Sequence, residues 1–366
     1  MSKRLTAGLL VAVLVLSLAV AGASAAAFAD SKLEAAVRSV LDVPQGPLTA
    51  ADLANLTSLA VPLEGISNLD GLQACVNLTY LDLRGNHISD LSPLAGLTKL
   101  KILLLSSNEI VDLSPLADLT NLVKLDLDYN WITSIAPLAK LKKLEWLGLW
   151  DSRVTDISVL AGLTKLSVLG LGSNPLSDIT PLSGLTELTW LGLASTGIDS
   201  IAPLAGLTRL VKLRLDGNHL SDLSTLAGFT KLRGVGLGNN QIADLSPLAK
   251  LSNLERLSLW GNQISDLAPL ASLTKLTKLY LDQNEISDLQ PLADLAQLSI
   301  LGLSDNRITD LAPLVANSGL SQGDEINLAD NPLDLSPGAA AARAIQTLEA
   351  RGASVQTASE QTGSEE

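Results

Sequence analysis

Residues 78–99 read LTYLDLRGNHISDLSPLAGLTK, and the pattern L-x-x-L-x-L-x-x-N-x-I-x-D-L-x-P-L-x-x-L-x-x recurs along the chain with a period equal to the length of this stretch. A fixed period of this kind predicts a solenoid, in which each repeat adds one structural unit to a stack. Twelve repeats keep this register, and they begin at Leu56, Leu78, Leu100, Leu122, Leu144, Leu166, Leu188, Leu210, Leu232, Leu254, Leu276 and Leu298.

The positions within one repeat specify its local structure. Leu81 and Leu83 alternate with outward residues, so this segment predicts a short strand with both leucines facing the core. Asn86 follows at the bend, where its side chain can bond exposed backbone groups, and its equivalents are expected to stack as a ladder. Pro93 suits the first position of a short helical turn, where a missing N–H costs nothing.

This pattern, with its D-L-x-P-L segment, resembles the internalin-type class of bacterial leucine-rich repeats over residues 56–335. The resemblance implies an α/β leucine-rich-repeat solenoid. Such a solenoid has a curved right-handed parallel β-sheet, a convex side of short 3-10 or irregular segments, and helical caps at both ends. The immunoglobulin-like segment and the cell-wall anchor of internalins have no counterpart here, so a role in host invasion is not implied.

Residues 1–27 have the composition of a secretory signal peptide. Lys3 and Arg4 precede the apolar run 9–20, and small residues follow it, with cleavage expected after Ala25 or Ala27. The run is shorter than the ~20 residues that span a bilayer. The alternative is an uncleaved anchor. With cleavage, we expect no integral membrane segment and a secreted or envelope-associated protein.

The remaining boundaries follow from the repeats. We expect an N-terminal helical cap over 28–55, about twelve regular repeats plus a closing repeat over 56–335, a C-terminal cap over 336–356, and a disordered acidic tail over 357–366. The first cap helix should start at Asp30 or Ser31, and we expect its apolar face to consist of Leu33, Val37, Val40 and Leu41. At the closing repeat the register slips by three residues, so that Ile326, Leu328 and Asn331 resume the strand pattern.

Seven positions in each repeat are apolar, which gives 84 inward sites in twelve repeats, and only Asn317 breaks the rule. The single cysteine, Cys75, occupies one of these sites and is expected to be a core residue. Burial of so many side chains, at roughly 1.5–3 kcal/mol each, is the expected source of stability in a chain without disulfides.

The charge and the motifs exclude several functions. The net charge of -13 falls to -15 when Lys3 and Arg4 are removed, because 23 basic residues then face 38 acidic ones. Such a chain is unsuited to nucleic acid as its main partner. The aspartates at the thirteenth position, such as Asp90, are expected to accept bonds from the turn that follows, and a cation ladder is the alternative. We expect no enzyme activity, no cofactor and no metal, because no catalytic constellation is present.

The third, fifth and seventh positions of each repeat should face the concave surface. Six of the eight Trp and Tyr residues lie there, interleaved with basic residues, and Tyr129 and Trp131 flank them. Gly148, Gly170 and Gly192 should leave a flat floor between the tryptophans. The predicted ligand-binding residues are Tyr80, Arg84, Lys124, Trp146, Trp150, Trp190, Lys212, Arg214, Arg256, Trp260, Lys278 and Tyr280.

This composition is typical of interface hot spots. The hypothesis is a monomeric binding protein that recognises a protein ligand through the concave face. Carbohydrate or cell-wall binding through the same tryptophans is one alternative, and a structural envelope scaffold is another. A purely structural explanation is that aromatic residues suit β-strands.

Overall fold

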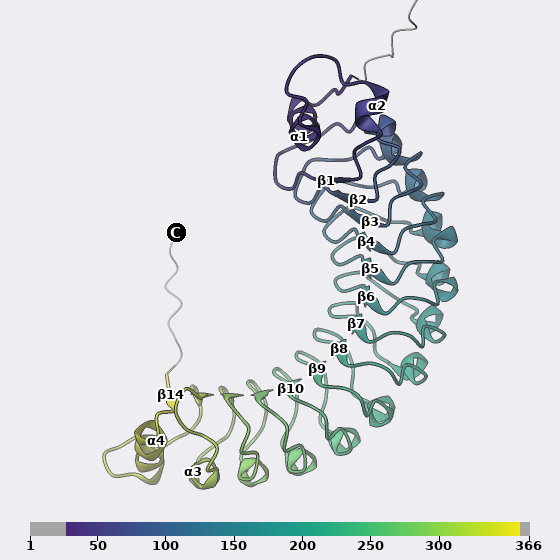
Figure 1. Cartoon of the computed structure of the whole chain (residues 1–366). Helices are drawn as coiled ribbons and strands as arrows, with labels where there is room; N and C mark the ends of the chain where they lie inside the picture. Colours follow the sequence, from purple (N-terminus) through teal and green to yellow (C-terminus); the bar gives the residue numbers. More distant parts are fainter. Residues whose placement is uncertain (1–26, 359–366) are drawn as a thin grey trace, which may run out of the picture.

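The computed structural model describes residues 27–358, which form a horseshoe-shaped solenoid (Figure 1). Its core is a single 14-stranded sheet whose strands lie side by side in sequence order, and every neighbouring pair is parallel. The sheet lines the inner side of the horseshoe, and short helical turns line the outer side. The predicted curved parallel solenoid is confirmed. The expected signal peptide, up to residue 26, and the tail from residue 359 lie outside the described residues.

All strands are three residues long, and consecutive strands from β1 to β12 are offset by one repeat. Glu325 pairs with Ile300, an offset of 25, so the predicted slip of three residues at the closing repeat is confirmed. The strands are β1 (Ser58–Ala60), β2 (Tyr80–Asp82), β3 (Ile102–Leu104), β4 (Lys124–Asp126), β5 (Trp146–Gly148), β6 (Val168–Gly170), β7 (Trp190–Gly192), β8 (Lys212–Arg214), β9 (Gly234–Gly236), β10 (Arg256–Ser258), β11 (Lys278–Tyr280), β12 (Ile300–Gly302), β13 (Glu325–Asn327) and β14 (Ser354–Gln356).

The convex side consists of single 3-10 turns, because each repeat has room for only one turn before the chain returns to the sheet. Where proline is present it occupies the second position of the turn, not the predicted first, since residues such as Ser92 begin the turn. The turns are η1 (Leu72–Ala74), η2 (Ser92–Leu94), η3 (Ser114–Leu116), η4 (Ala136–Lys140), η5 (Ser158–Gly162), η6 (Thr180–Leu182), η7 (Ala202–Leu204), η8 (Ser224–Gly228), η9 (Ser246–Leu248), η10 (Ala268–Leu270) and η11 (Gln290–Leu292), followed by the short helix α3 (Ala312–Ala316).

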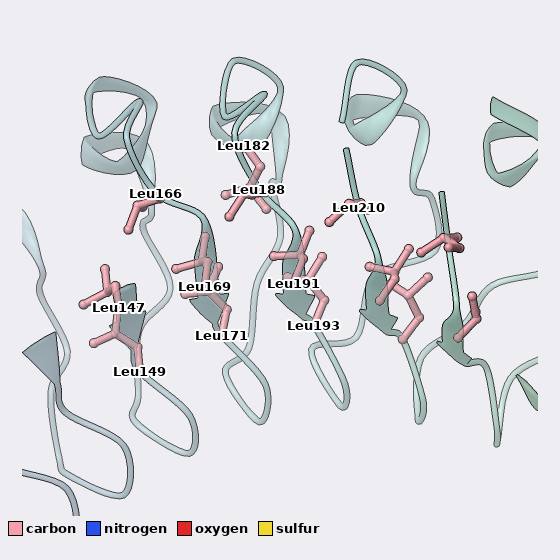
Figure 2. Close-up of a cluster of buried hydrophobic side chains, with 14 of the residues drawn as sticks. Leu147, Leu149, Leu166, Leu169, Leu171, Leu182, Leu188, Leu191, Leu193 and Leu210 are labelled. Atoms are coloured by element: carbon pink, nitrogen blue, oxygen red, sulfur yellow. The ribbon is translucent and has the colours of Figure 1, made fainter. Parts of the chain in front are cut away.

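The core lies between the sheet and the convex turns as one continuous leucine stack. Figure 2 shows equivalent leucines of successive repeats, such as Leu147, Leu169 and Leu191, repeating along the solenoid. Cys75 is buried in the same stack, and burial raises the pKa of its thiol to about 11, so the thiol stays protonated and unreactive at neutral pH. Core burial of this residue was predicted correctly.

Asn317, the one polar residue at an inward position, is fully buried. Its side-chain nitrogen donates to the carbonyl oxygens of Leu292 at 2.9 Å and Leu295 at 3.2 Å, and its Oδ1 accepts from the amide of Gly319 at 2.9 Å. These bonds offset the cost of burying the amide group at the junction where the register slips.

Helices close both ends of the solenoid. Helix α1 (Ser31–Leu41) begins after Asp30, whose carboxylate accepts from two backbone amides, and α2 (Ala50–Leu53) begins with a capping box. Helix α4 (Ala340–Ala350) packs on α3 and on β14 at the other end. The predicted helical caps are therefore present.

The apolar face of α1 is narrower than the sequence predicted. Leu33 and Val37 are buried, and Leu41 packs partly buried against the core. Val40, however, is 56% exposed, so its predicted place on this face is wrong. The physical reason is that Val40 lies on a flank of the helix that no other part of the cap covers.

The residue before the asparagine position adopts a left-handed conformation in every regular repeat. Tyr129 and Asp151, for example, have φ angles of 56° and 47°, whereas Gly85, Gly217 and Gly261 occupy the same position at no steric cost. The bend after each strand therefore has a fixed geometry, and it directs the next side chain inward.

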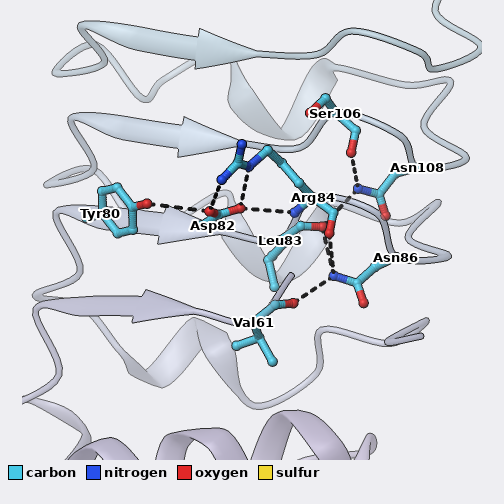
Figure 3. A network of polar contacts seen from close by, with 8 residues as sticks. All are labelled: Val61, Tyr80, Asp82, Leu83, Arg84, Asn86, Ser106 and Asn108. Carbon is cyan, nitrogen blue, oxygen red and sulfur yellow. Dashed lines mark hydrogen bonds and ion pairs between the residues drawn. The ribbon is translucent and has the colours of Figure 1, made fainter. Parts of the chain in front are cut away.

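That inward side chain is the predicted asparagine, and it couples each repeat to the one before it. The Nδ2 of Asn86 donates to the carbonyls of Val61 at 2.9 Å and Leu83 at 2.8 Å (Figure 3). Its Oδ1 accepts from the amide of Ile66 at 2.9 Å. The same three bonds recur at Asn108, Asn130, Asn174, Asn218, Asn240, Asn262, Asn284, Asn306 and Asn331. The ladder is confirmed.

The ladder is interrupted at Ser152 and Thr196. Thr196 keeps part of the network, because its hydroxyl bonds the carbonyl of Leu193 at 2.8 Å and the side chain of Asn218 at 3.0 Å. The hydroxyl of Ser152 is buried without a hydrogen-bond partner among the described residues. The ladder is therefore weakest between the repeats that begin at Leu122 and Leu144.

We predict that Ser152→Asn stabilises the protein by about 1 kcal/mol, because the longer amide can reach the backbone groups of the preceding repeat as its equivalents do. The measurement is the urea midpoint at constant m-value. The matched control is Asn240→Ser, which should destabilise by about 1–3 kcal/mol by removing the same bonds. Equal midpoints for Ser152→Asn and the unchanged chain would show that the gap in the ladder is energetically neutral.

Candidate functional site

The concave face holds the residues predicted to bind a ligand. In some parts of this face the basic side chains are paired with other residues of the protein, and in others they are not. At the N-terminal part, Arg84 makes a two-pronged ion pair with Asp82, with Nε–Oδ1 and Nη2–Oδ2 distances of 2.9 and 2.7 Å (Figure 3). Burial raises the pKa of Asp82, but the bonds and charge of Arg84 outweigh it, so the pKa lies below its ordinary value. Tyr80 contacts the same carboxylate at 3.5 Å. These two predicted site residues are thus engaged with Asp82.

The next basic residue along the concave face, Lys124, also contacts another side chain of the protein. The Nζ of Lys124 lies 4.4 Å from the centroid of the Trp146 ring, within the range of a cation–π interaction. A Cβ added at Gly148 would lie 2.8 Å from Cη2 of Trp146, so this indole extends along its own strand over the glycine.

All four concave tryptophans lie against glycine backbone, so the predicted flat floor is partly covered, at Gly148 by Trp146 and at Gly192 by Trp190. A Cβ at Gly192 would lie 2.7 Å from Cη2 of Trp190, and Cβ atoms at Gly172 and Gly238 would collide with the indoles of Trp150 and Trp260. The indoles lean over the glycines because no side chain there holds them upright. The indoles therefore fill the space that a side chain at these glycines would take.

One hollow on this face, of about 790 Å³, is centred on β9. Every outward position of this repeat is glycine (Gly234, Gly236 and Gly238), so the strand contributes no outward side chain of its own. We call this depression the β9 hollow, and its lining is Trp150, Trp190, Ala194, Lys212, Leu213, Arg214, Asp216, Gly234, Val235, Gly236, Arg256, Leu257, Ser258, Trp260 and Tyr280.

The β9 hollow brings together seven of the twelve predicted site residues: Trp150, Trp190, Lys212, Arg214, Arg256, Trp260 and Tyr280. Tyr80, Arg84, Lys124, Trp146 and Lys278 do not line it. Sequence reasoning missed the role of Gly234, Gly236 and Asp216. Three glycines in one repeat at the third, fifth and seventh positions were the signal that could have located the hollow.

The basic side chains of the β9 hollow carry no ion pair. Across residues 27–358, no carboxylate lies within ion-pair distance of Lys212, Arg214 or Arg256. All three residues are exposed. Asp216 also lines the hollow, but its Oδ1 accepts from the amide of Gly238 at 3.0 Å and its carboxylate covers Gly236.

A second carboxylate of the concave face has an unusual environment. Burial raises the pKa of Asp128 to about 6, despite a hydrogen bond from the amide of Trp150 at 2.6 Å, and the nearby charge of Asp126 raises it further. Asp128 thus changes charge close to neutral pH beside the backbone of a candidate tryptophan.

The aspartates of the thirteenth position serve the turns, as predicted. Oδ1 of Asp112 accepts from the amide and the hydroxyl of Ser114 at 2.8 and 2.6 Å, and these bonds hold the pKa of Asp112 below its ordinary value. Among residues 27–358, no group of three or more His, Cys, Asp and Glu side chains is arranged to hold a metal ion. In the same part of the chain, no helix is long and apolar enough to cross a membrane.

Comparisons with known proteins agree with this architecture. The family model for leucine-rich repeats in two copies matches residues 98–140, 142–184, 230–272, 252–294 and 274–317, and the single-repeat model matches residues 77–97. An internalin, InlF, of Listeria monocytogenes is 35% identical, with a TM-score of 0.84 over 91% of this chain and 96% of its own. A comparison with curated proteins gave no match.

Two more distant structures share the fold alone. A leucine-rich-repeat protein of Leptospira interrogans is 21% identical, with a TM-score of 0.58 over 84% of this chain and 97% of its own. The Arabidopsis receptor kinase HAESA, solved in complex with the peptide hormone IDA and the co-receptor SERK1, is 21% identical, with a TM-score of 0.58 over 76% of this chain and 59% of its own.

We predict that Asp128→Asn stabilises the protein at pH 7.5 and leaves its stability nearly unchanged at pH 4. Because the folded state raises the pKa of this carboxyl from 3.8 to about 6, its contribution to stability is present at low pH and is lost as the pH rises through 6. The gain at pH 7.5 should be about 1 kcal/mol after a discount for partial solvent exposure. The D128N side chain can still accept the Trp150 amide bond.

The measurement is the thermal midpoint at both pH values. Asp126→Asn, which removes a neighbouring charge on β4, is the matched control and should give a smaller difference between the two pH values. A midpoint gain for D128N that is the same at pH 4 and pH 7.5 would contradict the assigned titration.

Proposed function

Because the chain belongs to the internalin-like leucine-rich-repeat family, we propose that it is a binding protein that recognises a protein ligand through the concave face of its sheet. The observation that carries this proposal is the β9 hollow, where Trp150, Trp190, Trp260 and Tyr280 surround basic side chains that lack ion-pair partners. Trp, Tyr and Arg are the residues enriched at interface hot spots.

The rigidity of the face supports the proposal. Every strand is hydrogen-bonded in the sheet, and the indoles are packed against glycine backbone, so little conformational entropy is lost when a ligand binds. The distant plant receptor kinase HAESA, which shares the fold, was solved in complex with a peptide hormone, which agrees with protein or peptide recognition on such a scaffold. No step of catalysis is proposed for this site.

Export is part of the proposal and rests on the sequence of residues 1–27, with its basic start, apolar run and small-residue cleavage positions. On this basis the protein acts outside the cytoplasmic membrane, either secreted or associated with the envelope. An extracytoplasmic ligand should then be sought among surface and secreted proteins.

Carbohydrate is the second candidate ligand, and one observation favours it. Trp150 and Trp190 both lie against glycine backbone and are half-buried, and an indole held in this way can stack on the apolar face of a sugar ring. Their shared neighbour Gly192 contacts both indoles. The two candidates differ in the class of molecule captured and can be separated in one experiment.

We predict that the chain lacking residues 1–27, when immobilised, retains a ligand that the combined Trp150→Ala, Trp190→Ala and Trp260→Ala variant does not retain. The reason is that these side chains supply most of the aromatic surface of the β9 hollow. Surface-protein and polysaccharide extracts are applied separately, and the retained material is identified by mass spectrometry and by sugar analysis.

The matched control is Tyr129→Ala with Trp131→Ala, which removes two aromatics that are 53% and 47% exposed but do not line the hollow. This control should retain the ligand, and circular dichroism should show both variants folded. Retention of a polysaccharide alone would select the second candidate. Equal retention by the unchanged chain and the triple variant would exclude the concave face as the binding site and favour a scaffold role.

A further inference from the structure

We propose that the β9 hollow binds an acidic polypeptide segment, with carboxylates of the ligand bound by Lys212, Arg214 and Arg256 and its apolar side chains placed on the flanking indoles. This inference rests on the proposed function and specifies its ligand. It follows from three features of the described residues: the pairing of charges elsewhere on the molecule, the register of the sheet at the hollow, and the shortage of acceptors there.

Elsewhere on the surface, several arginines are paired with acidic residues of the neighbouring repeat. Arg209 pairs with Glu187, Arg233 with Glu255, and Arg307 with Glu285, and in each pair the partners stand at the same position of adjacent repeats. The chain has 38 acidic residues and a net charge of -13, so acids are in excess as partners. Lys212, Arg214 and Arg256, by contrast, lie together around one hollow without such a partner.

The sheet register shows why no acid reaches the cations of the hollow. Lys212 stands between Trp190 and Gly234, and Arg214 stands between Gly192 and Gly236. Arg256 stands between Gly234 and another cation, Lys278. The neighbouring positions, which hold glutamate beside the paired arginines, thus hold glycine, tryptophan or lysine here. The result is a local cluster of three cations against one lining carboxylate, that of Asp216, with which none of the three forms an ion pair.

The spacing of these cations suits an extended chain. Arg214 on β8 and Arg256 on β10 are separated by two strand steps and by two residues along the strand direction, a backbone distance of roughly 12 Å, and the glycine strand β9 lies between them. An extended peptide advances about 3.3 Å per residue, so acidic side chains two to four residues apart can reach both guanidinium groups. Guanidinium groups bind carboxylates through two parallel hydrogen bonds, which gives such a contact its directionality.

The shortage of acceptors favours carboxylates over sugar hydroxyls. A neutral sugar presents hydroxyl groups that need acceptors as well as donors. In the β9 hollow Oδ1 of Asp216 accepts from the amide of Gly238, the carboxylate lies over Gly236, and Ser258 supplies the aliphatic hydroxyl of the lining. The donors therefore outnumber the free acceptors, as expected for an anionic ligand.

The test uses fluorescein-labelled peptides of alternating Glu and Ser, with a tryptophan at one end, and matched peptides in which Gln or Lys replaces Glu. Binding to the chain lacking residues 1–27 is followed by fluorescence polarisation. The Glu peptide should bind at least tenfold more tightly than the Gln peptide, and its affinity should fall when salt is added. The Lys peptide should not bind. Equal affinity for the Glu and Gln peptides, or no binding at millimolar concentration, would overturn the proposal.

The variant is Arg214→Gln with Arg256→Gln, and its charge-matched control is Arg209→Gln with Arg233→Gln, which removes two arginines that are paired outside the hollow. The Arg214→Gln, Arg256→Gln variant should bind the Glu peptide at least tenfold more weakly, and the control should keep the original affinity. The thermal midpoints of both variants should be unchanged. Equal losses in both variants would overturn the proposal, because only the net charge would then matter. Tighter binding of polygalacturonate than of the Glu peptide would also overturn it and assign the hollow to an acidic polysaccharide.

Protein binding by the concave face and acidic-segment binding by the β9 hollow can be tested separately. If the tryptophan-dependent capture succeeds and the Arg214→Gln, Arg256→Gln variant still retains the captured protein, the concave face binds protein but the acidic-segment inference is wrong. If the capture fails while the Glu peptide binds with the expected dependence on Arg214 and Arg256, the hollow binds acidic segments and the physiological ligand lies outside the extracts.

Discussion

The solenoid depends on the hydrogen bonds made by the asparagine at the ninth position of most repeats. The amide of this asparagine joins the carbonyl groups of two successive repeats and accepts an amide bond from the earlier one, as Asn108 does for Leu83, Leu105 and Ile88. Because the bend is buried, these backbone groups would otherwise lose their hydrogen bonds to water. The bonds therefore fix the distance and the register between repeats, and the leucine stack fills the space that they define.

A fixed register turns the concave surface into a set of straight columns. Once Leu213, Val235 and Leu257 face the core, the residues on either side of them must face the ligand side. The properties of the hollow then follow from which residues share a column. Glycine at all three outward positions of one repeat makes the depression, and the absence of acids beside Lys212 and Arg256 leaves those cations unpaired.

The sequence predicted the repeat structure well, because periodicity specifies which side chains are buried. The inward leucines, the asparagine ladder and the turn-capping role of residues such as Asp112 all follow from a position in the repeat. Features that depend on side-chain conformation were not predicted. The indoles of Trp150 and Trp260 lean onto glycines of neighbouring repeats, and the pattern gives their position but not their direction. Val40 was misplaced because a single cap helix has no repeat to fix which residues its neighbour covers.

The all-glycine strand β9 also separates like charges. Removal of this one repeat, from Leu232 to Asn253, would preserve the leucine core and the register, yet it would bring Arg256 beside Lys212 at the distance of adjacent strands, about 4.8 Å. Distances between recognition elements on this face are thus multiples of one strand step, and each step corresponds to one repeat unit of coding sequence. Unequal recombination between such units, which loses or duplicates whole repeats, would change ligand selectivity in discrete increments without disturbing the fold.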